Sequence, residues 1–457
     1  MTGFMQEEPR QLMHDSRRQV GQEVTDSDFC QLDDGGRISN LPQDLLHCIL
    51  RRLSVDDAAT TSVLSKEWRY IWAMNTHLVL DKLFFAQLTA KIIDKEAHQS
   101  AFSRAVEKII LVYLNNLVSF NLYIPPKIDR CPVTRWIEHF VKKGLRYLEL
   151  NNYENKAYEI PSCLFDCVTL RGLKLTICIL NAPKCTIFTN LLQVILTNVT
   201  FNADISFGTQ LRHLRLDQCT GLKHLGTQFT KGNSLTTVLL IGGEQIDWRW
   251  FEFTSLLRRL ALEFTSYSNF IPNKAINVVK FLNVLPSIFA FCTSGFTLGV
   301  CRPGLTNGHA TKCDNLKELI LNCVGSYDLC QISNAIYLIS CLPNLQRLEI
   351  LLQVDDKSRD FIASTSNLDA TDWNDMSLRQ LQTVIIMDVD GSKYVSHLVK
   401  ILLASSPALE VMSLRIHVGL TDPTEKLKIK QELEHFPRRS SAAQVLWFQN
   451  HPNSRPK

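Results

Sequence analysis

The sequence of 457 residues lacks the features that mark several protein classes. No uninterrupted apolar stretch reaches the ~18 residues that a membrane-spanning helix needs. The first 36 residues carry acidic side chains and no apolar segment, so they do not match a signal peptide. No run of Lys or Arg exceeds two residues and the net charge is only +4, which gives no signal for binding nucleic acid or a membrane surface.

Motifs of metal binding and catalysis are missing as well. The 14 cysteines are scattered without a Cys-x-x-Cys pair, and several lie in strand-like runs. This pattern favours buried, reduced thiols of an intracellular protein, in the nucleus, the cytoplasm or both. His309 and Cys313, with Cys301 and Cys323 nearby, fit no zinc-finger spacing. No phosphate-binding glycine loop, nucleophile elbow or H-E-x-x-H motif occurs, so we expect no metal, no cofactor and no catalytic residues.

What is present starts with a compact run of helical patterns over residues 38–72. Pro42 can occupy the opening turn of a first helix. Ser54 and Asp57 fit a capping box for a second helix, and Ser65 can cap a third. The apolar residues of the first helix form one wide face: Leu45, Leu46, Ile49, Leu50 and Leu53. The third helix carries Trp68, Ile71 and Trp72.

A unit of this size cannot bury all of that apolar surface in its own core. Either the helices pack on the rest of the chain, or part of the face is kept for a partner. The segment resembles an F-box of the plant type, in the runs Arg-Ile-Ser-Asn-Leu-Pro (37–42) and Ser-Val-Leu-Ser-Lys-Glu-Trp-Arg-Tyr-Ile-Trp (62–72). One departure is Glu67, where a basic residue is more usual in that family.

The resemblance implies docking onto a Skp-type adaptor and, through it, onto the cullin and RING subunits of an SCF ubiquitin ligase. Trp68 and Trp72 have the alternative role of holding the three helices together. The positions that match the family's adaptor-facing residues are Leu41, Pro42, Leu45, Ile49, Leu53, Val63, Leu64 and Trp68.

From Leu145 onward a motif of the form L-x-x-L-x-L recurs, with starts 20 to 36 residues apart. This spacing is typical of leucine-rich repeats of irregular length. The alternating apolar residues of each copy predict a short strand, and successive strands can stack in parallel. The copies start at Leu145, Leu170, Leu191, Leu211, Leu235, Leu257, Ile288, Leu316, Leu345, Leu381 and Leu409.

The segments between several copies have helical patterns. Residues 332–342 and 394–402 each present one apolar face and end before a proline, and residues 133–143 show the same periodicity. We therefore predict an α/β fold: a three-helix F-box, then a curved, irregular leucine-rich-repeat solenoid with parallel strands on one face and helices on the other.

The C-terminal part has its own signature. Asp422-Pro423-Thr424-Glu425 predicts a helix start. Together with the last two repeats and the run Phe436 to Phe448, it resembles the FBD module of plant F-box/FBD/LRR-repeat proteins. The end of a solenoid exposes its last apolar strand, so we expect this module to act as a cap.

These patterns predict a division of the chain into consecutive segments. Residues 299–315 and 353–377 interrupt the repeats as candidate surface loops. The expected segments are a disordered acidic tail (1–36), the F-box (37–76), an α/β segment leading into the solenoid (77–144), the leucine-rich repeats (145–377), the FBD module and cap (378–450) and a short tail (451–457).

One aromatic run stands out within the repeats. In residues 247–253 alternation places Trp248 and Trp250 on one side of a strand and two phenylalanines on the other. Aromatic residues beside an arginine are typical of interaction hot spots, so both tryptophans are candidates for substrate binding. A strand buried on both faces would have the same pattern, and core packing is the favoured interpretation.

The expected function is that of a substrate-recognition subunit of an SCF-type ubiquitin ligase. Such a subunit is not an enzyme; it raises the rate by holding a target protein near the reacting groups. The alternatives are an F-box/LRR interaction scaffold outside any ligase, and a small-molecule co-receptor.

Overall fold

The computed structural model falls into two compact units, one ending at Asn75 and the other beginning at Thr76. The residues that the structure describes are 41–50, 53, 55–61, 75–112, 117–153, 156–182, 186–203, 205–221, 234–242, 251, 254–264, 278–300, 312–354 and 376–448.

Within the described residues of the first unit lie the short helices α2 (Gln43–Leu50) and α3 (Val55–Thr60). Pro42 directly precedes α2, and its carbonyl oxygen accepts the N–H groups of Leu45 (2.9 Å) and Leu46 (3.1 Å). Proline suits this place because its missing N–H would have no partner in the first turn. The predicted acidic tail and the predicted third helix lie outside the described residues.

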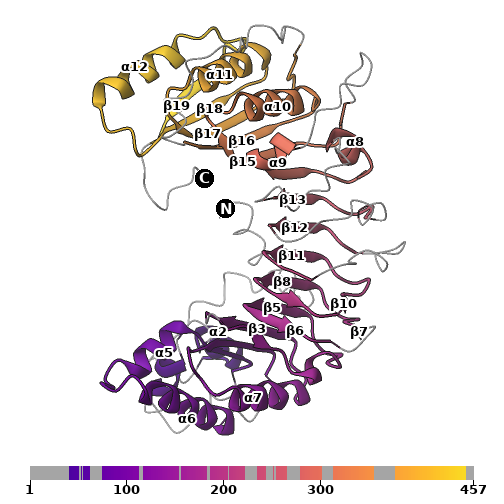
Figure 1. The fold of residues 1–457 in the computed structure, drawn as a ribbon, viewed down its shortest axis with the longest axis vertical. Helices are drawn as coiled ribbons and strands as arrows, with labels where there is room; N and C mark the ends of the chain where they lie inside the picture. Colours follow the sequence, from indigo (N-terminus) through magenta and orange to yellow (C-terminus); the bar gives the residue numbers. More distant parts are fainter. Residues whose placement is uncertain are drawn as a thin grey trace, which may run out of the picture. The chain divides into compact units, whose positions relative to one another are not determined.

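The second unit is built on a fourteen-stranded parallel sheet whose strands follow the order of the chain (Figure 1). The strands are β1 (His77–Leu80), β2 (Ser119–Ile124), β3 (Tyr147–Asn152), β5 (Gly172–Thr176), β8 (Gln193–Thr197), β11 (His213–Asp217), β12 (Thr237–Ile241), β13 (Arg259–Glu263), β14 (Ala290–Ser294), β15 (Glu318–Gly325), β16 (Arg347–Gln353), β17 (Thr383–Val389), β18 (Val411–Ile416) and β19 (Gln444–Trp447).

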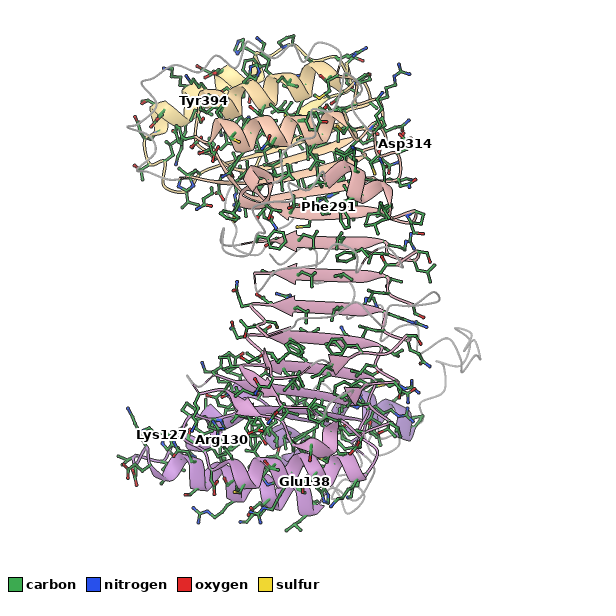
Figure 2. The ribbon with its side chains drawn as sticks, turned by 45° about the vertical axis from the view of Figure 1, so that its right-hand side comes forward. Lys127, Arg130, Glu138, Phe291, Asp314 and Tyr394 are labelled. Atoms are coloured by element: carbon green, nitrogen blue, oxygen red, sulfur yellow. The ribbon has the colours of Figure 1, made fainter. Side chains whose placement is uncertain are left out.

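The predicted repeats are confirmed as parallel strands. Every copy of the motif forms a strand that begins two residues after its first apolar residue, from Leu145 before β3 to Leu409 before β18. The second and fourth strand positions are buried and in register from strand to strand, as in Leu148 beside Leu173. Phe291 takes the leucine's place in β14 and is buried in the same layer (Figure 2). One continuous apolar layer therefore runs along the sheet.

Two strands precede the first predicted repeat in the same register. Phe120 of β2 pairs with Leu148, and Leu78 of β1 pairs with Phe120. Leu117, Phe120 and Leu122 keep the spacing of the motif, with phenylalanine in place of its central leucine. The segment 77–144 thus supplies the first two strands of the sheet.

Helices accompany the first and the last strands, while the middle of the unit differs from the prediction. There, where the motif recurs every 20 to 25 residues, the described return segments are a 3₁₀ turn and short strands instead of helices, because so few residues leave no length for one. The helices are α5 (Lys82–Thr89), α6 (Ala97–Val112), α7 (Arg130–Lys142), α8 (Val278–Asn283), α9 (Gly295–Val300), α10 (Leu329–Ser340), α11 (Lys393–Ser405) and α12 (Pro423–Glu434). The short elements are η5 (Ser162–Leu164), β4 (Tyr158–Glu159), β6 (Cys178–Leu180), β7 (Thr186–Ile187), β9 (Thr200–Phe201) and β10 (Ile205–Ser206).

The predicted helix faces are confirmed where the structure describes them. In α10 the buried side chains include Ile332, Ile336 and Ile339, which lie on one side of the helix. Asp422 caps α12 by accepting the Thr424 N–H at 2.9 Å. The predicted surface loop 299–315 starts inside α9 and otherwise lies largely outside the described residues, as does the predicted loop 353–377.

A residue in the left-handed conformation recurs at the same place in several repeats. In each case it is the sixth residue counted from the start of the strand; it directly follows the shorter strands and lies within the longer strands β15 and β17. In β15 and β17 the pairing register shifts at this point. These residues are Ile177, Asn198, Gln218, Gly242, Cys323 and Asp388. No helix among the described residues has the length and apolar character to cross a membrane.

Candidate partner-docking surface

Helix α2 divides its apolar residues between two sides. Leu46 and Leu50 are buried with 3% and 1% of their surface exposed, and they form a small core with Ala58 of α3. Their chain neighbours Leu45 and Ile49 are 51% and 39% exposed. The single wide face expected from the sequence is therefore two stripes, and only one of them is used inside this unit.

The exposed stripe extends beyond the helix at both ends. Leu41 and Leu53 are also more than a third exposed, and Leu53 continues the last turn through its N–H bond to the Leu50 carbonyl oxygen (3.2 Å). Residues four apart lie on the same side of a helix. We call these four side chains the docking stripe: Leu41, Leu45, Ile49 and Leu53.

The docking stripe follows from the small size of the core beside it. Two buried leucines and one alanine fix α2 against α3, and the hydroxyl groups of Thr60 and Thr61 close the last turn of α3 on the carbonyl oxygens of Asp57 and Ala58. Two helices this short leave further apolar residues of α2 without cover. A group of large aliphatic side chains exposed side by side is a candidate site for contact with another protein.

Several predicted site residues lie outside the described part of the chain. These are Val63, Leu64, Trp68, Trp248 and Trp250. Next to Trp250, the side chain of Phe251 is buried and packs edge-on against Phe281, with ring centroids 5.5 Å apart.

The strands carry a second row of side chains opposite the apolar layer, at the first, third and fifth strand positions. We call this side the second face of the sheet. It holds ion pairs between Lys174 and Glu149 (2.6 Å) and between Arg215 and Asp217 (3.0 Å). Sequence reasoning missed the residues of this face because alternation gives their side but no chemical pattern.

On the second face, Glu263 of β13 accepts hydrogen bonds from Asn322 of β15 and from the thiol of Cys292 on β14. The three residues occupy neighbouring strands, although 59 residues separate Glu263 from Asn322 in the chain. Only the register of the repeats brings them together, so no local sequence signal could have found them.

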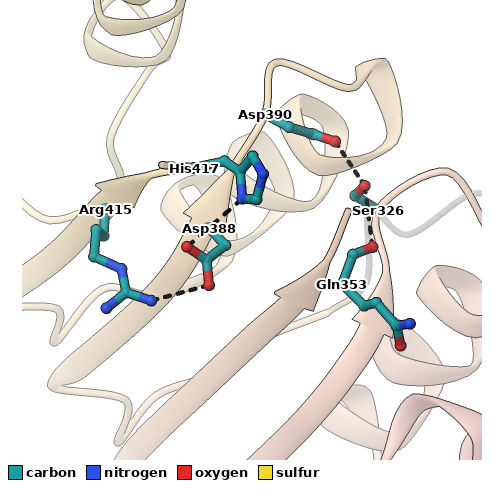
Figure 3. A network of polar contacts seen from close by, with 6 residues as sticks. All are labelled: Ser326, Gln353, Asp388, Asp390, Arg415 and His417. Carbon is teal, nitrogen blue, oxygen red and sulfur yellow. Dashed lines mark hydrogen bonds and ion pairs between the residues drawn. The ribbon is translucent and has the colours of Figure 1, made fainter. Parts of the chain in front are cut away.

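A buried polar network joins the carboxyl ends of the last strands (Figure 3). The Ser326 hydroxyl donates to Asp390 Oδ2 at 2.6 Å, and the Ser392 N–H donates to Asp390 Oδ1 at 3.0 Å. Close by, Asp388 pairs with Arg415 at 2.9 Å and lies 3.8 Å from His417. Both aspartate carboxylates are bound by side-chain or backbone groups of this chain. The network therefore links β15, β17 and β18 to one another.

The buried thiols are suited to packing. Burial raises the pKa of Cys178 to about 12 and that of Cys219 to about 11, so both stay neutral and are poor nucleophiles. Among the residues that the structure describes, no group of three or more His, Cys, Asp or Glu side chains could hold a metal ion. Of the His and Cys residues whose spacing fits no zinc finger, Cys313 is buried and His309 lies outside the described residues.

Comparison with known proteins agrees with this arrangement. Residues 38–79 match the F-box domain family. The F-box/FBD/LRR-repeat protein At1g13570 of Arabidopsis thaliana is 27% identical over 434 residues, which are 90% of this chain and 98% of the relative. The FBD-associated F-box protein At5g56370 of the same plant is 33% identical over 141 residues, 30% of this chain and 31% of the relative.

A third relative, the Arabidopsis thaliana F-box/LRR-repeat protein At4g14103, is 32% identical over 139 residues, 30% of this chain and 35% of the relative. The similarity to At1g13570 covers 90% of this chain, so it extends far beyond the F-box match at residues 38–79. The chain therefore carries an F-box match at residues 38–79 and is similar over 90% of its length to a plant F-box/FBD/LRR-repeat protein.

Proposed function

We propose that this chain is the substrate-recognition subunit of an SCF-type ubiquitin ligase. In this proposal the F-box binds a Skp-type adaptor, which connects the chain to the cullin and RING subunits, and the repeats bind a target protein. The observation that carries the proposal is the exposed docking stripe on α2, within the segment that matches the F-box domain.

The adaptor contact is expected to draw on apolar burial. Fully burying a leucine or isoleucine side chain contributes about 1.5–3 kcal/mol, and the docking stripe keeps part of that surface exposed on four such residues. Several of them at one interface can outweigh the entropy lost on association. The proposed adaptor-facing residues are Leu41, Pro42, Leu45, Ile49 and Leu53, with Val63, Leu64 and Trp68 of the remaining F-box.

The sheet provides a long, continuous surface for a target, and the chain itself makes and breaks no bond in this proposal. Holding the target near the ubiquitin-carrying subunit raises the effective concentration of its lysines. The ligase activity would take place in the nucleus, the cytoplasm or both.

We further propose the domain division 37–76 for a three-helix F-box, 77–144 for the segment leading into the solenoid, 145–377 for the repeats and 378–450 for the FBD module. The module would act as the terminal cap. The Trp447 indole N–H donates to Glu434 Oε1 at 2.7 Å, and Lys430 lies 5.4 Å from the centre of the same ring. These contacts hold the last strand, β19, against α12.

The test is recovery of the full chain with a Skp-type adaptor and a cullin from co-expressing cells. The variant Leu45→Asp with Ile49→Asp should lose the adaptor, because two carboxylates would be buried at the interface. Leu83→Asp is the matched control, since Leu83 on α5 is 70% exposed and lies outside the docking stripe. Adaptor recovery without cullin would favour a scaffold outside the ligase, and no recovery of the adaptor would refute the proposal.

A further inference from the structure

Basic side chains recur at the amino-terminal edge of the sheet. The strands run side by side in one direction, so their amino ends share one edge (Figure 2). The residue directly before the strand is basic for β3, β5, β11, β13 and β15. We call these five residues the basic row: Arg146, Arg171, Arg212, Arg258 and Lys317.

Backbone hydrogen bonds fix the register of the basic row. The Leu192 N–H donates to the Arg171 carbonyl oxygen at 2.7 Å, and the Leu192 carbonyl oxygen accepts the Arg212 N–H at 2.9 Å. From Arg171 onward one uncharged residue stands in this way between successive charges. Because neighbouring strands lie about 4.8 Å apart, the charged positions repeat about every 10 Å. The linking residues are Leu192, Thr236 and Phe289.

The basic row is open to solvent, and the chain does not neutralise its charge. All of its members except the half-buried Arg171 are exposed. Among the residues that the structure describes, no carboxylate lies within ion-pair distance of any member. Arg171 donates to the Asn190 carbonyl oxygen at 3.3 Å and to Gln210 Oε1 at 3.5 Å, and both acceptors are neutral.

The acidic residues near this edge do not offset the row. Asp166, Asp314 and Glu318 lie within five residues of a member in the chain, and none of them forms an ion pair with it in the described part of the structure. On the second face of the sheet, by contrast, Lys174 pairs with Glu149 at 2.6 Å. The positive charge of the basic row is therefore left for a partner to neutralise.

The spacing of the charges restricts the partner. An extended chain rises about 3.3 Å per residue, so acidic residues at every third position also repeat about every 10 Å. A polynucleotide fits less well, because sites for single strands stack successive bases on aromatic side chains. Phe289 is the only aromatic residue at the positions directly before the strands from β5 to β16, all of which the structure describes.

Resting on the proposed function above, we propose that the basic row is a docking surface for an acidic segment of the target protein. The segment lies extended across the amino ends of the strands. It presents a carboxylate at every third residue, and these carboxylates pair with the four members from Arg171 to Lys317. Complementary charge of this kind raises the rate of association and selects between partners.

The test uses the full chain co-purified with its Skp-type adaptor and labelled synthetic peptides as the probe. Peptides of about 12 residues span the four positions. The spaced peptide carries glutamate at every third residue. The clustered peptide has the same composition with its glutamates adjacent, and the neutral peptide has glutamine in their place. Fluorescence anisotropy at low salt should show the spaced peptide binding at least about tenfold more tightly than the other two.

The double variant Arg212→Gln with Arg258→Gln should weaken binding of the spaced peptide by at least about tenfold. Arg104→Gln with Lys108→Gln is the matched control, because it removes the same charge from exposed positions of α6 and should bind as the wild type does. Arg212→Glu with Arg258→Glu should instead prefer a peptide with lysine at every third residue, a reversal that loss of structure cannot produce.

Equal binding of the spaced and neutral peptides by the wild-type chain, or equal binding of the spaced and clustered ones, overturns the inference. So does full binding by Arg212→Gln with Arg258→Gln, or an equal loss in the α6 control. If a single-stranded oligonucleotide binds in place of the peptides and loses affinity in the same variant, the row serves a polynucleotide and the inference is overturned.

Should the variants of the basic row fail to fold, the three peptides on the wild-type chain decide alone. Adaptor and cullin recovery is measured on the same preparations, so that a failure of the ligase proposal is seen separately from a failure at the basic row.

Discussion

Leu45 and Leu46 are neighbours in the chain and lie in opposite environments, with 51% and 3% of their surface exposed. The peptide bond between them joins the docking stripe to the core of the first unit. Because one helix turn carries both, substitutions at these two positions separate binding from folding.

The first prediction concerns this pair. Leu45→Ala should weaken adaptor binding by about ten- to thirtyfold while the free energy of unfolding changes little, because the removed atoms are largely solvated. Leu46→Ala should lower the free energy of unfolding by about 2–5 kcal/mol through the cavity it leaves. Titration calorimetry with the adaptor and urea denaturation measure the two quantities. Equal losses of stability in both variants would show that Leu45 belongs to the core.

The second prediction concerns backbone strain at Ile177. This β-branched residue has φ of 53°, a left-handed conformation that costs about 1–2 kcal/mol for most residues. Asn198 occupies the equivalent position of the next repeat with the same φ. Ile177→Asn should therefore raise the free energy of unfolding by about 0.5–1 kcal/mol in urea denaturation. Ile179→Asn, in strand β6 two residues later, is the control and should destabilise; similar losses from both would refute the strain argument.

The sequence was sufficient to predict the parallel strands because burial in this fold is periodic along the chain. The spacing of Leu145, Leu148 and Leu150 indicates which side of the strand faces the core, and every later copy of the motif has the same spacing. The leucine pattern did not identify β2 as a repeat strand, because Phe120 replaces the central leucine of the motif. The predicted solenoid has helices on the face opposite its strands throughout, whereas the described return segments of the middle repeats are too short for a helix.

The candidate surfaces were predictable only in part. Leu45 and Leu46 both fit a wide helical face, and the position of Ala58 on α3 decides which of them is covered. Glu263 and Asn322 belong to repeats of different length, so their 2.6 Å contact depends on the register of three strands and leaves no trace in either local sequence. Long-range geometry of this kind is set by the whole sheet.

The third prediction concerns the network at the carboxyl ends of the last strands. Ser326→Ala removes the 2.6 Å bond to the buried Asp390 carboxylate, so the free energy of unfolding should fall by about 1–3 kcal/mol. Ser340→Ala is the control, because its hydroxyl bonds the Tyr337 carbonyl oxygen within its own helix turn and holds no carboxylate, and its effect should stay within about 0.5 kcal/mol. Urea denaturation measures both, and equal effects would mean that Asp390 finds another donor.

The fourth prediction concerns pH. The pKa of the Cys178 thiol is about 12 in the folded chain and 9.0 in the reference state, so above pH 9 the unfolded chain loses this proton first. The free energy of unfolding should therefore fall as pH rises from 9 toward 12, the direction that linkage requires when the unfolded state binds fewer protons. Urea midpoints at several pH values should fall less steeply for Cys178→Ala than for the wild type. Cys131→Ala, at an exposed position, should keep the wild-type slope; an unchanged slope for Cys178→Ala would contradict the prediction.

The fifth prediction concerns the end of the sheet. Truncation after Thr421 removes α12 and β19, which leaves β18 as an unpaired edge and uncovers the contacts of the buried Ile429 and Leu433. An exposed parallel edge beside apolar side chains is a template for pairing with another chain. The truncated protein should therefore self-associate in size-exclusion chromatography with light scattering. Truncation after Phe448 keeps both elements and should remain at the size of the full chain. If the chain truncated after Thr421 also elutes at the size of the full chain, β18 needs no cover and the C-terminal module has another role.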